Sequence, residues 1–139
     1  MSMKVVFLDR DGTVIQDPPD ERVDSLDKLE LFPDSIEALK YLADNGFSAV
    51  IITNQAGIAE GRLTEDDFWK IQYEVLAQLA PSGIKILKTY MNGEAGPDAS
   101  QWRKPGPKML LQAAKDFDLD LKDIYMVGDS LADIGAAMN

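Results

Sequence analysis

The sequence predicts an α/β domain in which helices cover both faces of a parallel sheet. Short apolar runs alternate with amphipathic segments along the 139 residues, as expected when strands and crossover helices build a parallel sheet. The apolar runs are rich in β-branched and aromatic residues, which is typical of strands buried on both faces. Polar side chains follow three of the four runs directly. In a parallel sheet these positions share one edge, where ligands bind.

The first predicted strand covers residues 5–8 and leads directly into Asp9 and Asp11, before the chain turns at Gly12. Alternation along an extended backbone would place the two aspartates on the same side. Two neighbouring carboxylates repel each other unless a cation or a shared proton lies between them, which favours a metal site or a catalytic pair. The competing interpretation is an ordinary polar turn, because a motif as short as DRDG also occurs by chance.

Residues 14–32 form an irregular, mostly polar segment with Pro18, Pro19 and five acidic residues between Asp17 and Asp27. Connections of this length inside a compact domain are usually functional loops or lids. Because the segment follows the two aspartates directly, we predict that it forms a flap over the site.

The next element is a predicted helix with Asp34 as its N-cap, Glu37 as the capping-box partner and Gly46 as the left-handed residue that ends it. A second strand over 47–52 then brings residues 53–55 to the edge of the sheet that carries the aspartates. Thr64 is predicted to cap the following helix, which stops at Pro81. The remaining predicted elements are a strand over 85–90, a loop over 92–101, a helix over 107–117, a strand over 124–127 and a helix over 131–138.

The composition restricts the chemistry. The chain contains neither cysteine nor histidine, which excludes disulfides, thiol catalysis, imidazole bases and the usual zinc ligands. Acid–base work must then fall to Asp, Glu, Lys or Tyr, and any metal should be a hard cation such as magnesium. The net charge of −10 argues against broad binding to nucleic acid or to an anionic membrane. With no membrane-spanning stretch and no signal segment, we expect one cytoplasmic, monomeric domain.

The predicted edge of the sheet suits a phosphate group. The carboxylates, Lys104 and Thr53 together would hold a phosphate dianion beside a divalent cation. With no His, Cys or activated Ser in view, a carboxylate is the best available nucleophile. Phosphoryl transfer to a carboxylate and then to water splits one hard step into two easier ones. Positioning and charge neutralisation would supply most of the acceleration.

Four motifs then carry a resemblance that covers nearly the whole chain. They are Asp9-Arg10-Asp11-Gly12-Thr13, Thr53-Asn54-Gln55, Arg103-Lys104-Pro105 and Gly128-Asp129-Ser130-Leu131-Ala132-Asp133. In order and spacing they resemble the haloacid dehalogenase (HAD) superfamily of phosphatases. DRDGT, TNQAGIAEG and RKPGP are similar to subfamily III, which includes heptose bisphosphate and histidinol-phosphate phosphatases. The resemblance implies a three-layer, Rossmann-like fold with a minimal cap, and a magnesium-dependent phosphomonoester hydrolase.

The resemblance also implies the catalytic and metal-binding roles. Asp9 would be the nucleophile that forms an aspartyl-phosphate. Asp11 would be the acid that protonates the leaving oxygen and then the base that activates water. Magnesium would be held by the Asp9 carboxylate, the Asp11 backbone carbonyl and Asp129.

Further residues are implied to hold the substrate. Thr53 and Lys104 would bind the phosphate, with Asn54 and Arg103 nearby, and Asp133 would support Lys104 or the waters of the metal. Residues 23–29 are similar to the histidinol-phosphatase branch, whereas residues 57–68 are closer to the heptose branch. We therefore expect a small phosphorylated metabolite, either a sugar phosphate or an amino-alcohol phosphate.

Two departures from the family pattern stand out. The sugar and histidinol phosphatases of this group usually carry a zinc loop of Cys and His before the RKP motif, whereas residues 91–102 contain neither, so we expect no zinc. Such phosphatases normally continue past Asn139 with another strand and helix, so the chain is either truncated or lacks an edge strand. Without a large cap, the 14–32 flap and the 92–102 loop must choose the substrate.

Two other functions stay open. The zinc-less loop also resembles the phosphatase half of polynucleotide kinase 3′-phosphatases, so a nucleic-acid end is an alternative substrate, although the net charge weighs against it. A non-catalytic phospho-acceptor or scaffold, such as a signalling receiver, also uses carboxylates, a Thr or Ser and a Lys around magnesium. A receiver places its acceptor aspartate after the third strand, where this chain has Tyr90-Met91-Asn92.

Overall fold

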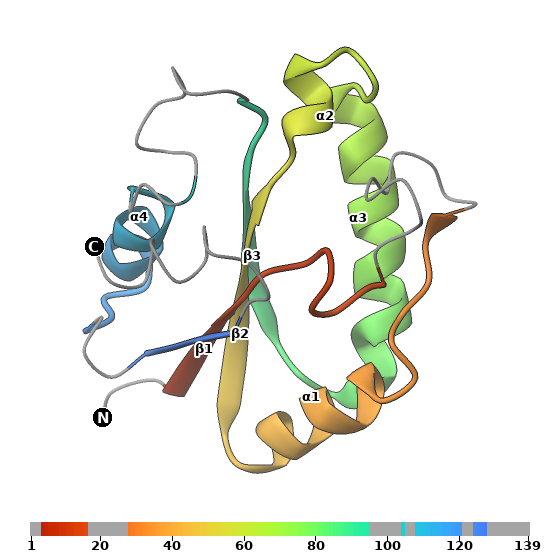
Figure 1. Ribbon diagram of the computed structural model, residues 1–139. Helices are drawn as coiled ribbons and strands as arrows, with labels where there is room; N and C mark the ends of the chain where they lie inside the picture. The colour runs from red at the N-terminus through yellow and green to blue at the C-terminus, as the bar shows by residue number, and fades with distance from the viewer. Residues whose placement is uncertain (1–3, 17–27, 95–103, 105–107, 121–123, 128–139) are drawn as a thin grey trace.

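A four-stranded parallel sheet forms the centre of the computed structural model of the protein (Figure 1). The strand order is β3-β2-β1-β4, with β1 at Lys4–Leu8, β2 at Phe47–Asn54, β3 at Ile86–Asn92 and β4 at Tyr125–Val127. The structure describes residues 4–16, 28–94, 104, 108–120 and 124–127.

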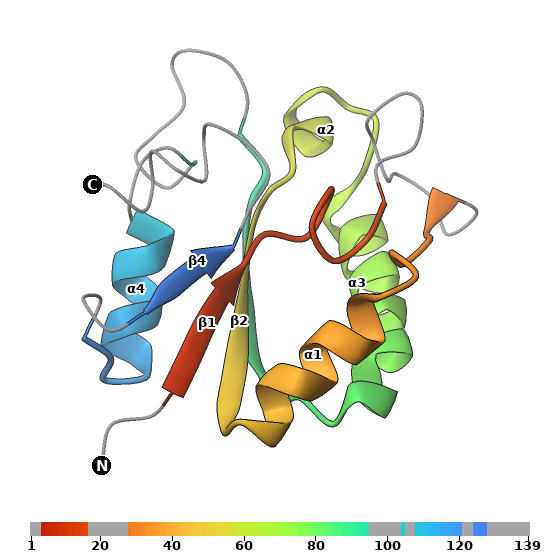
Figure 2. The same ribbon diagram turned by 60° about the horizontal axis from the view of Figure 1, so that its bottom comes forward.

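Helices cover both faces of this sheet, which confirms the predicted α/β architecture (Figures 1 and 2). Helices α1 (Ser35–Asp44) and α3 (Glu65–Leu79) lie on one face, and α4 (Lys108–Asp116) lies on the other. Two short elements were not predicted from the sequence pattern, namely the helix α2 (Ala56–Ala59) after β2 and the 3-10 turn η2 (Ala80–Ser82) after α3.

Strand β1 is buried on both faces because its side chains alternate between two apolar clusters. Val6 and Leu8 pack in the cluster that includes side chains of α1 and α3, whereas Val5 and Phe7 pack in the cluster that includes side chains of α4. Each of these side chains is nearly inaccessible to solvent. Burying one such side chain contributes about 1.5–3 kcal/mol to stability. The strand that leads into the two aspartates is therefore rigidly held.

Strands β2 and β3 both run two residues further than the apolar pattern predicts. The predicted ends were residues 52 and 90, whereas the strands end at Asn54 and Asn92. Thr53 still pairs with Met91 and Asn54 with Asn92, although the apolar side chains of β2 stop at Ile52. Thr53 is consequently a strand residue rather than part of the turn that follows.

Of the predicted N-caps of α1 and α3, that of α3 is confirmed and that of α1 is wrong. Thr64 caps α3 as predicted, since its side chain accepts a hydrogen bond from the N–H of Asp67 and the Asp67 carboxylate accepts one from the N–H of Thr64. The capping box predicted at Asp34 is wrong, because the Asp34 side chain makes no capping hydrogen bond and its backbone is not extended. Ser35 anchors this end of α1 instead, by donating from its hydroxyl to the Val14 carbonyl at 2.8 Å.

The two ends of the predicted flap are paired with each other. Ile15 forms an antiparallel bridge with Leu31, and the N–H of Gln16 donates to the carbonyl of Glu30 at 2.7 Å. Val14 and Ile15 are buried in the core rather than exposed in a polar loop. Residues 17–27 lie outside the described residues, so the position of the flap over the site stays a prediction.

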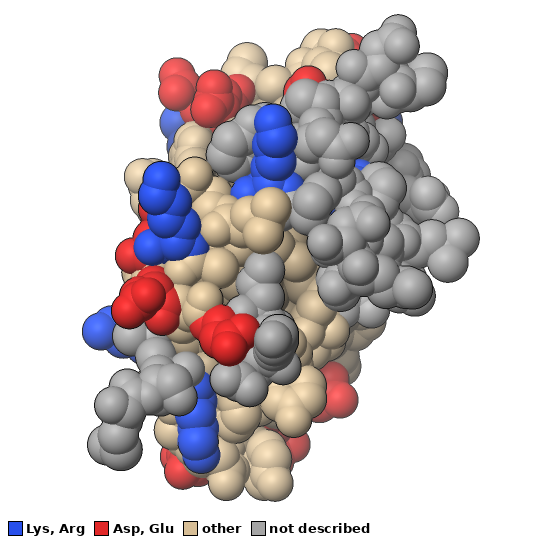
Figure 3. All heavy atoms as spheres, turned by 90° about the vertical axis from the view of Figure 1, so that its left-hand side faces the viewer, with Lys and Arg blue, Asp and Glu red and all other residues tan. Residues whose placement is uncertain are grey.

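The face that carries α4 has charges of both signs. Basic and acidic side chains are interspersed there among uncharged ones (Figure 3). Within this region, Asp116 of α4 pairs with Lys88 of β3 at 3.8 Å. Along the described stretches of the chain, no helix is both long enough and apolar enough to cross a lipid bilayer.

Candidate active site

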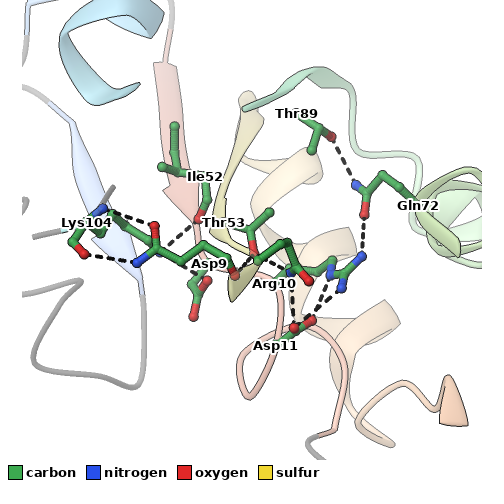
Figure 4. Close-up of polar contacts among 10 residues, drawn as sticks. Asp9, Arg10, Asp11, Ile52, Thr53, Gln72, Thr89 and Lys104 are labelled. Atoms are coloured by element: carbon green, nitrogen blue, oxygen red, sulfur yellow. Dashed lines mark hydrogen bonds and ion pairs between the residues drawn. The ribbon is translucent and has the colours of Figure 1, made fainter. Parts of the chain in front are cut away.

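Asp9 follows β1 at the carboxyl edge of the sheet and forms an ion pair with Lys104 (Figure 4). The Lys104 Nζ lies 3.1 Å from Asp9 Oδ1 and also donates to the Ile52 carbonyl of β2 at 2.9 Å. The two side chains are only 2% and 10% exposed, for Lys104 and Asp9 respectively. Removing one partner of a buried ion pair typically costs about 3–5 kcal/mol, so each charge depends on the other.

Asn54 of β2 holds the backbone of Lys104. The Asn54 Nδ2 donates to the Lys104 carbonyl at 3.0 Å, and the Lys104 N–H donates back to Asn54 Oδ1 at 3.0 Å. This two-point contact ties the segment before α4 to the edge of the sheet. The family resemblance predicts Asn54 near the phosphate. In the structure, its side-chain amide contacts the Lys104 backbone and orients that residue.

Arg10, between the two aspartates, has the largest of the fully buried side chains among the described residues. Its Nε donates to Asp11 Oδ1 at 2.7 Å and its Nη2 donates to Asp11 Oδ2 at 3.4 Å. The guanidinium carbon lies 4.8 Å from the centre of the Phe68 ring, within the range of a cation–π contact. Two-pronged contacts of this kind fix the plane of a carboxylate as well as its position.

Gln55 connects Asp11 with Thr53. Its Nε2 donates to Asp11 Oδ2 at 3.1 Å and to Thr53 Oγ1 at 2.9 Å. Gln55 and Thr53 are buried, whereas 22% of the Asp11 side chain is exposed. Asp11 is therefore the more accessible of the two aspartates, and a ligand at the edge of the sheet can reach it.

Strand β1 ends at Leu8 and the fully buried Arg10 lies between the two aspartates, so the placement of Asp9 and Asp11 on the same side stays a prediction. Each carboxylate has its own cation, with Lys104 beside Asp9 and Arg10 beside Asp11. The two basic side chains thus also relieve the repulsion between the carboxylates, for which the sequence predicts a metal ion or a shared proton.

The structure brings four of the five principal predicted residues together. Asp9 is hydrogen-bonded to Lys104, which Asn54 holds, and Asp11 is hydrogen-bonded through Gln55 to Thr53. A contact of 3.4 Å from the Thr53 hydroxyl to the Asn54 carbonyl joins the two groups. The fifth, Asp129, lies outside the described residues, and so do Arg103, Asp133 and the loop from residue 95 to residue 102. Their roles stay predictions.

The donor atoms at this edge suit a hard cation. Asp9 and Asp11 offer carboxylate and carbonyl oxygens, and the chain has no thiolate or imidazole that would favour zinc. Within the part of the chain that the structure describes, no group of three acidic side chains is placed to bind a metal ion. The predicted third ligand, Asp129, is not in that part. The donors present fit magnesium in kind.

Sequence reasoning missed the side chains behind Asp11. Gln72 of α3 accepts a hydrogen bond from Arg10 Nη1 at 3.3 Å and donates from Nε2 to Thr89 Oγ1 of β3 at 3.0 Å. One signal was available, because Gln72 lies one helical turn after Phe68 on the apolar stripe of α3. A polar side chain at such a position needs a buried partner.

The site combines a buried carboxylate, an ammonium group beside it and a second, more accessible carboxylate. Lysine supplies a compact positive charge for an anion, and a carboxylate is a competent nucleophile towards phosphorus. A neighbouring carboxyl group can donate a proton to a leaving oxygen and later accept one from water. The geometry therefore suits the transfer of a phosphoryl group.

Comparison with known proteins points the same way. Residues 16–139 match the family model described as haloacid dehalogenase-like hydrolase. The chain is 37% identical over 145 residues to the D-glycero-β-D-manno-heptose-1,7-bisphosphate 7-phosphatase of Yersinia pestis, a match that covers 99% of the chain and 76% of that protein. It is also 37% identical over 138 residues to the histidine biosynthesis bifunctional protein HisB of Spirosoma linguale. That match covers 98% of the chain but 36% of the longer relative.

Solved structures show the same similarity. The D,D-heptose 1,7-bisphosphate phosphatase from B. bronchiseptica, complexed with magnesium and phosphate, is 34% identical with a TM-score of 0.90. The alignment covers 98% of this chain and 75% of that one. The D,D-heptose 1,7-bisphosphate phosphatase from Burkholderia thailandensis is 27% identical with a TM-score of 0.68, over 97% of this chain and 72% of that one.

Proposed function

Because the chain belongs to the haloacid dehalogenase-like hydrolase family and is a phosphatase domain of that family, we propose that it hydrolyses a small sugar phosphate. The observation that carries the proposal is the buried ion pair of Asp9 and Lys104, with the more accessible Asp11 beside it at the carboxyl edge of the sheet. This arrangement provides a nucleophile, a positive charge for the phosphate and a group that can carry a proton.

In the proposed first half-reaction, a carboxylate oxygen of Asp9 attacks the phosphorus atom of the substrate. The new O–P bond forms on Asp9 as the bond from phosphorus to the sugar oxygen breaks, and Asp11 gives its proton to that oxygen. In the second half-reaction Asp11 takes a proton from water, and the water oxygen attacks the phosphorus. Inorganic phosphate leaves, and the Asp9 carboxylate is restored.

Lys104 and Thr53 are the proposed contacts to the phosphate oxygens, and Asn54 keeps Lys104 in place. A magnesium ion would be held by the Asp9 carboxylate, the Asp11 backbone carbonyl and Asp129. When bound, it supplies positive charge that offsets the charge of the phosphate. The supporting roles predicted for Arg103 and Asp133 remain proposals. We also propose that the protein is monomeric and cytoplasmic.

A heptose 1,7-bisphosphate is the first proposed substrate. Two relatives named as 7-phosphatases of this sugar, from Yersinia pestis and Campylobacter jejuni, are 37% and 36% identical, and the chain covers 76% and 78% of their lengths. Histidinol phosphate is the second, because the chain also resembles about a third of the bifunctional HisB proteins. The names of these relatives favour a metabolite over the end of a polynucleotide.

A substrate panel tests the proposal. With magnesium present, phosphate release is measured from D-glycero-D-manno-heptose 1,7-bisphosphate, histidinol phosphate, other sugar phosphates, a 3′-phosphorylated oligonucleotide and 4-nitrophenyl phosphate. We expect the highest kcat/KM with a sugar phosphate. A preference for the oligonucleotide would assign a different substrate to the protein without changing the proposed mechanism. No release from any compound, together with no effect of Asp11→Asn, would favour a non-catalytic scaffold.

A further inference from the structure

A row of buried polar side chains extends from β3 through α3 to the aspartate proposed for proton transfer (Figure 4). Thr89 of β3 accepts a hydrogen bond from Gln72 of α3 at 3.0 Å, and Gln72 accepts one from Arg10 at 3.3 Å. Arg10 in turn donates to both carboxylate oxygens of Asp11. Each hydrogen bond in this row is made by a different donor group, so the donor and the acceptor are defined in every contact.

The row lies inside the apolar core. Arg10 and Gln72 are fully buried, and Thr89 is 9% exposed. On α3, Gln72 lies among buried apolar side chains, including Phe68 and Val75. Burying an amide and a guanidinium costs free energy unless their hydrogen bonds are made. An apolar side chain would fill the place of Gln72 without that cost, so what Gln72 adds is an oriented acceptor.

The geometry explains what this acceptor does. A guanidinium group is a planar fork, and its Nη1 is bound by Gln72 while Phe68 packs against it. With these contacts made, the Nε and Nη2 atoms of Arg10 face Asp11 in a single orientation. The contact between Gln72 Nε2 and Thr89 turns the carbonyl end of the Gln72 amide towards Arg10. The orientation of the Asp11 carboxylate thus depends, through Arg10 and Gln72, on the contact with Thr89 of β3.

We propose that Gln72 and Thr89 are positioning residues for the phosphatase reaction. They orient Arg10, and Arg10 holds the Asp11 carboxyl group where its proton can reach the leaving oxygen. Neither residue touches the substrate. The inference rests on the proposed function, because it takes Asp11 as the group that gives its proton to the sugar oxygen.

The test compares two leaving groups. A sugar oxygen is a poor leaving group that needs the proton from Asp11, whereas 4-nitrophenolate leaves readily without one. The quantity measured is kcat/KM, which covers the steps up to departure of the leaving group and is insensitive to the shared hydrolysis of the aspartyl-phosphate. Gln72→Met removes the acceptor and keeps the size of the side chain. We expect kcat/KM to fall about 10- to 100-fold for heptose 1,7-bisphosphate, but less than about threefold for 4-nitrophenyl phosphate.

Matched variants separate positioning from stability. Val75→Ala removes apolar volume from the same helix and should lower the melting temperature while leaving the ratio of the two kcat/KM values unchanged. Thr89→Val removes the hydroxyl at the far end of the row and should shift the ratio in the same direction as Gln72→Met. Thr89→Ser keeps the hydroxyl and should restore the wild-type ratio. Thr89→Val and Thr89→Ser together distinguish a positioning role from a purely structural one even if Gln72→Met does not fold.

The outcomes are distinct. Equal losses with both substrates, or an unchanged ratio in Gln72→Met and Thr89→Val, would overturn the inference while the wild-type activity leaves the proposed function intact. A wild-type protein that releases phosphate from neither substrate would refute the proposed function, and the inference would fall with it.

Discussion

The contact between Asn54 and Lys104 yields the most direct quantitative prediction. Asn54→Ala removes two hydrogen bonds of 3.0 Å that join the side-chain amide to the N–H and the carbonyl of Lys104. Each such bond contributes about 0.5–1.5 kcal/mol. The free energy of unfolding should therefore fall by about 1–3 kcal/mol, which corresponds to a decrease of about 3–10 °C in melting temperature for a domain of this size.

Urea denaturation and thermal unfolding measure this loss, and Asn45→Ala is the matched control. The Asn45 side chain also donates to a backbone carbonyl, that of Tyr41 at 2.8 Å, but at an exposed site. Its replacement should change stability by less than about 0.5 kcal/mol. Because Asn54 fixes the backbone from which the Lys104 ammonium extends, Asn54→Ala should also weaken inhibition by inorganic phosphate, and Asn45→Ala should not.

An Asn54→Ala variant that unfolds at the same urea concentration as Asn45→Ala would contradict this prediction. That result would mean that Lys104 keeps its place without the contact from β2. Unchanged inhibition by phosphate despite a clear loss of stability would be a narrower failure. It would leave Asn54 as a structural residue and remove its role in presenting Lys104.

Three further predictions concern the capping of α3, the metal and a surface carboxylate. Thr64→Ala should cost about 0.5–2 kcal/mol in urea denaturation because it breaks the capping box of α3, whereas Asp34→Ala, at a position with no capping bond, should cost little. Chelation with EDTA should abolish phosphate release, and added magnesium should restore it. The hydrogen bond from the Tyr90 hydroxyl holds the pKa of Asp116 below its ordinary value of 3.8. A lowered pKa in the folded state contributes stability above pH 3.8 that is lost as the pH falls further. Tyr90→Phe should therefore lose less stability than the wild type between pH 5 and pH 3.

The order of the described strands and longer helices followed from local patterns in the sequence, and so did the edge of the sheet at which Asp9 and Lys104 meet. Apolar runs bounded by glycine and polar residues predicted the strands, and Thr64 marked the start of α3. The patterns failed at the end of β2, because backbone pairing carries that strand past its last apolar residue, and at the end of β3, where Met91 and Asn92 still pair with β2. They also failed at Asp34, because an aspartate before a helix caps it only when its backbone is extended.

The amino-acid sequence alone predicts the kind of chemistry. Oxygen donors, one lysine motif and the absence of thiol and imidazole groups predict a site for a phosphate and a hard cation. Which basic side chain lies beside each aspartate depends on the three-dimensional packing. Lys104 reaches Asp9 across 95 positions, Gln72 meets Arg10 across 62, and Asn54 holds Lys104 across 50. Contacts at such separations depend on how the sheet and α3 pack in space, and no local periodicity encodes them.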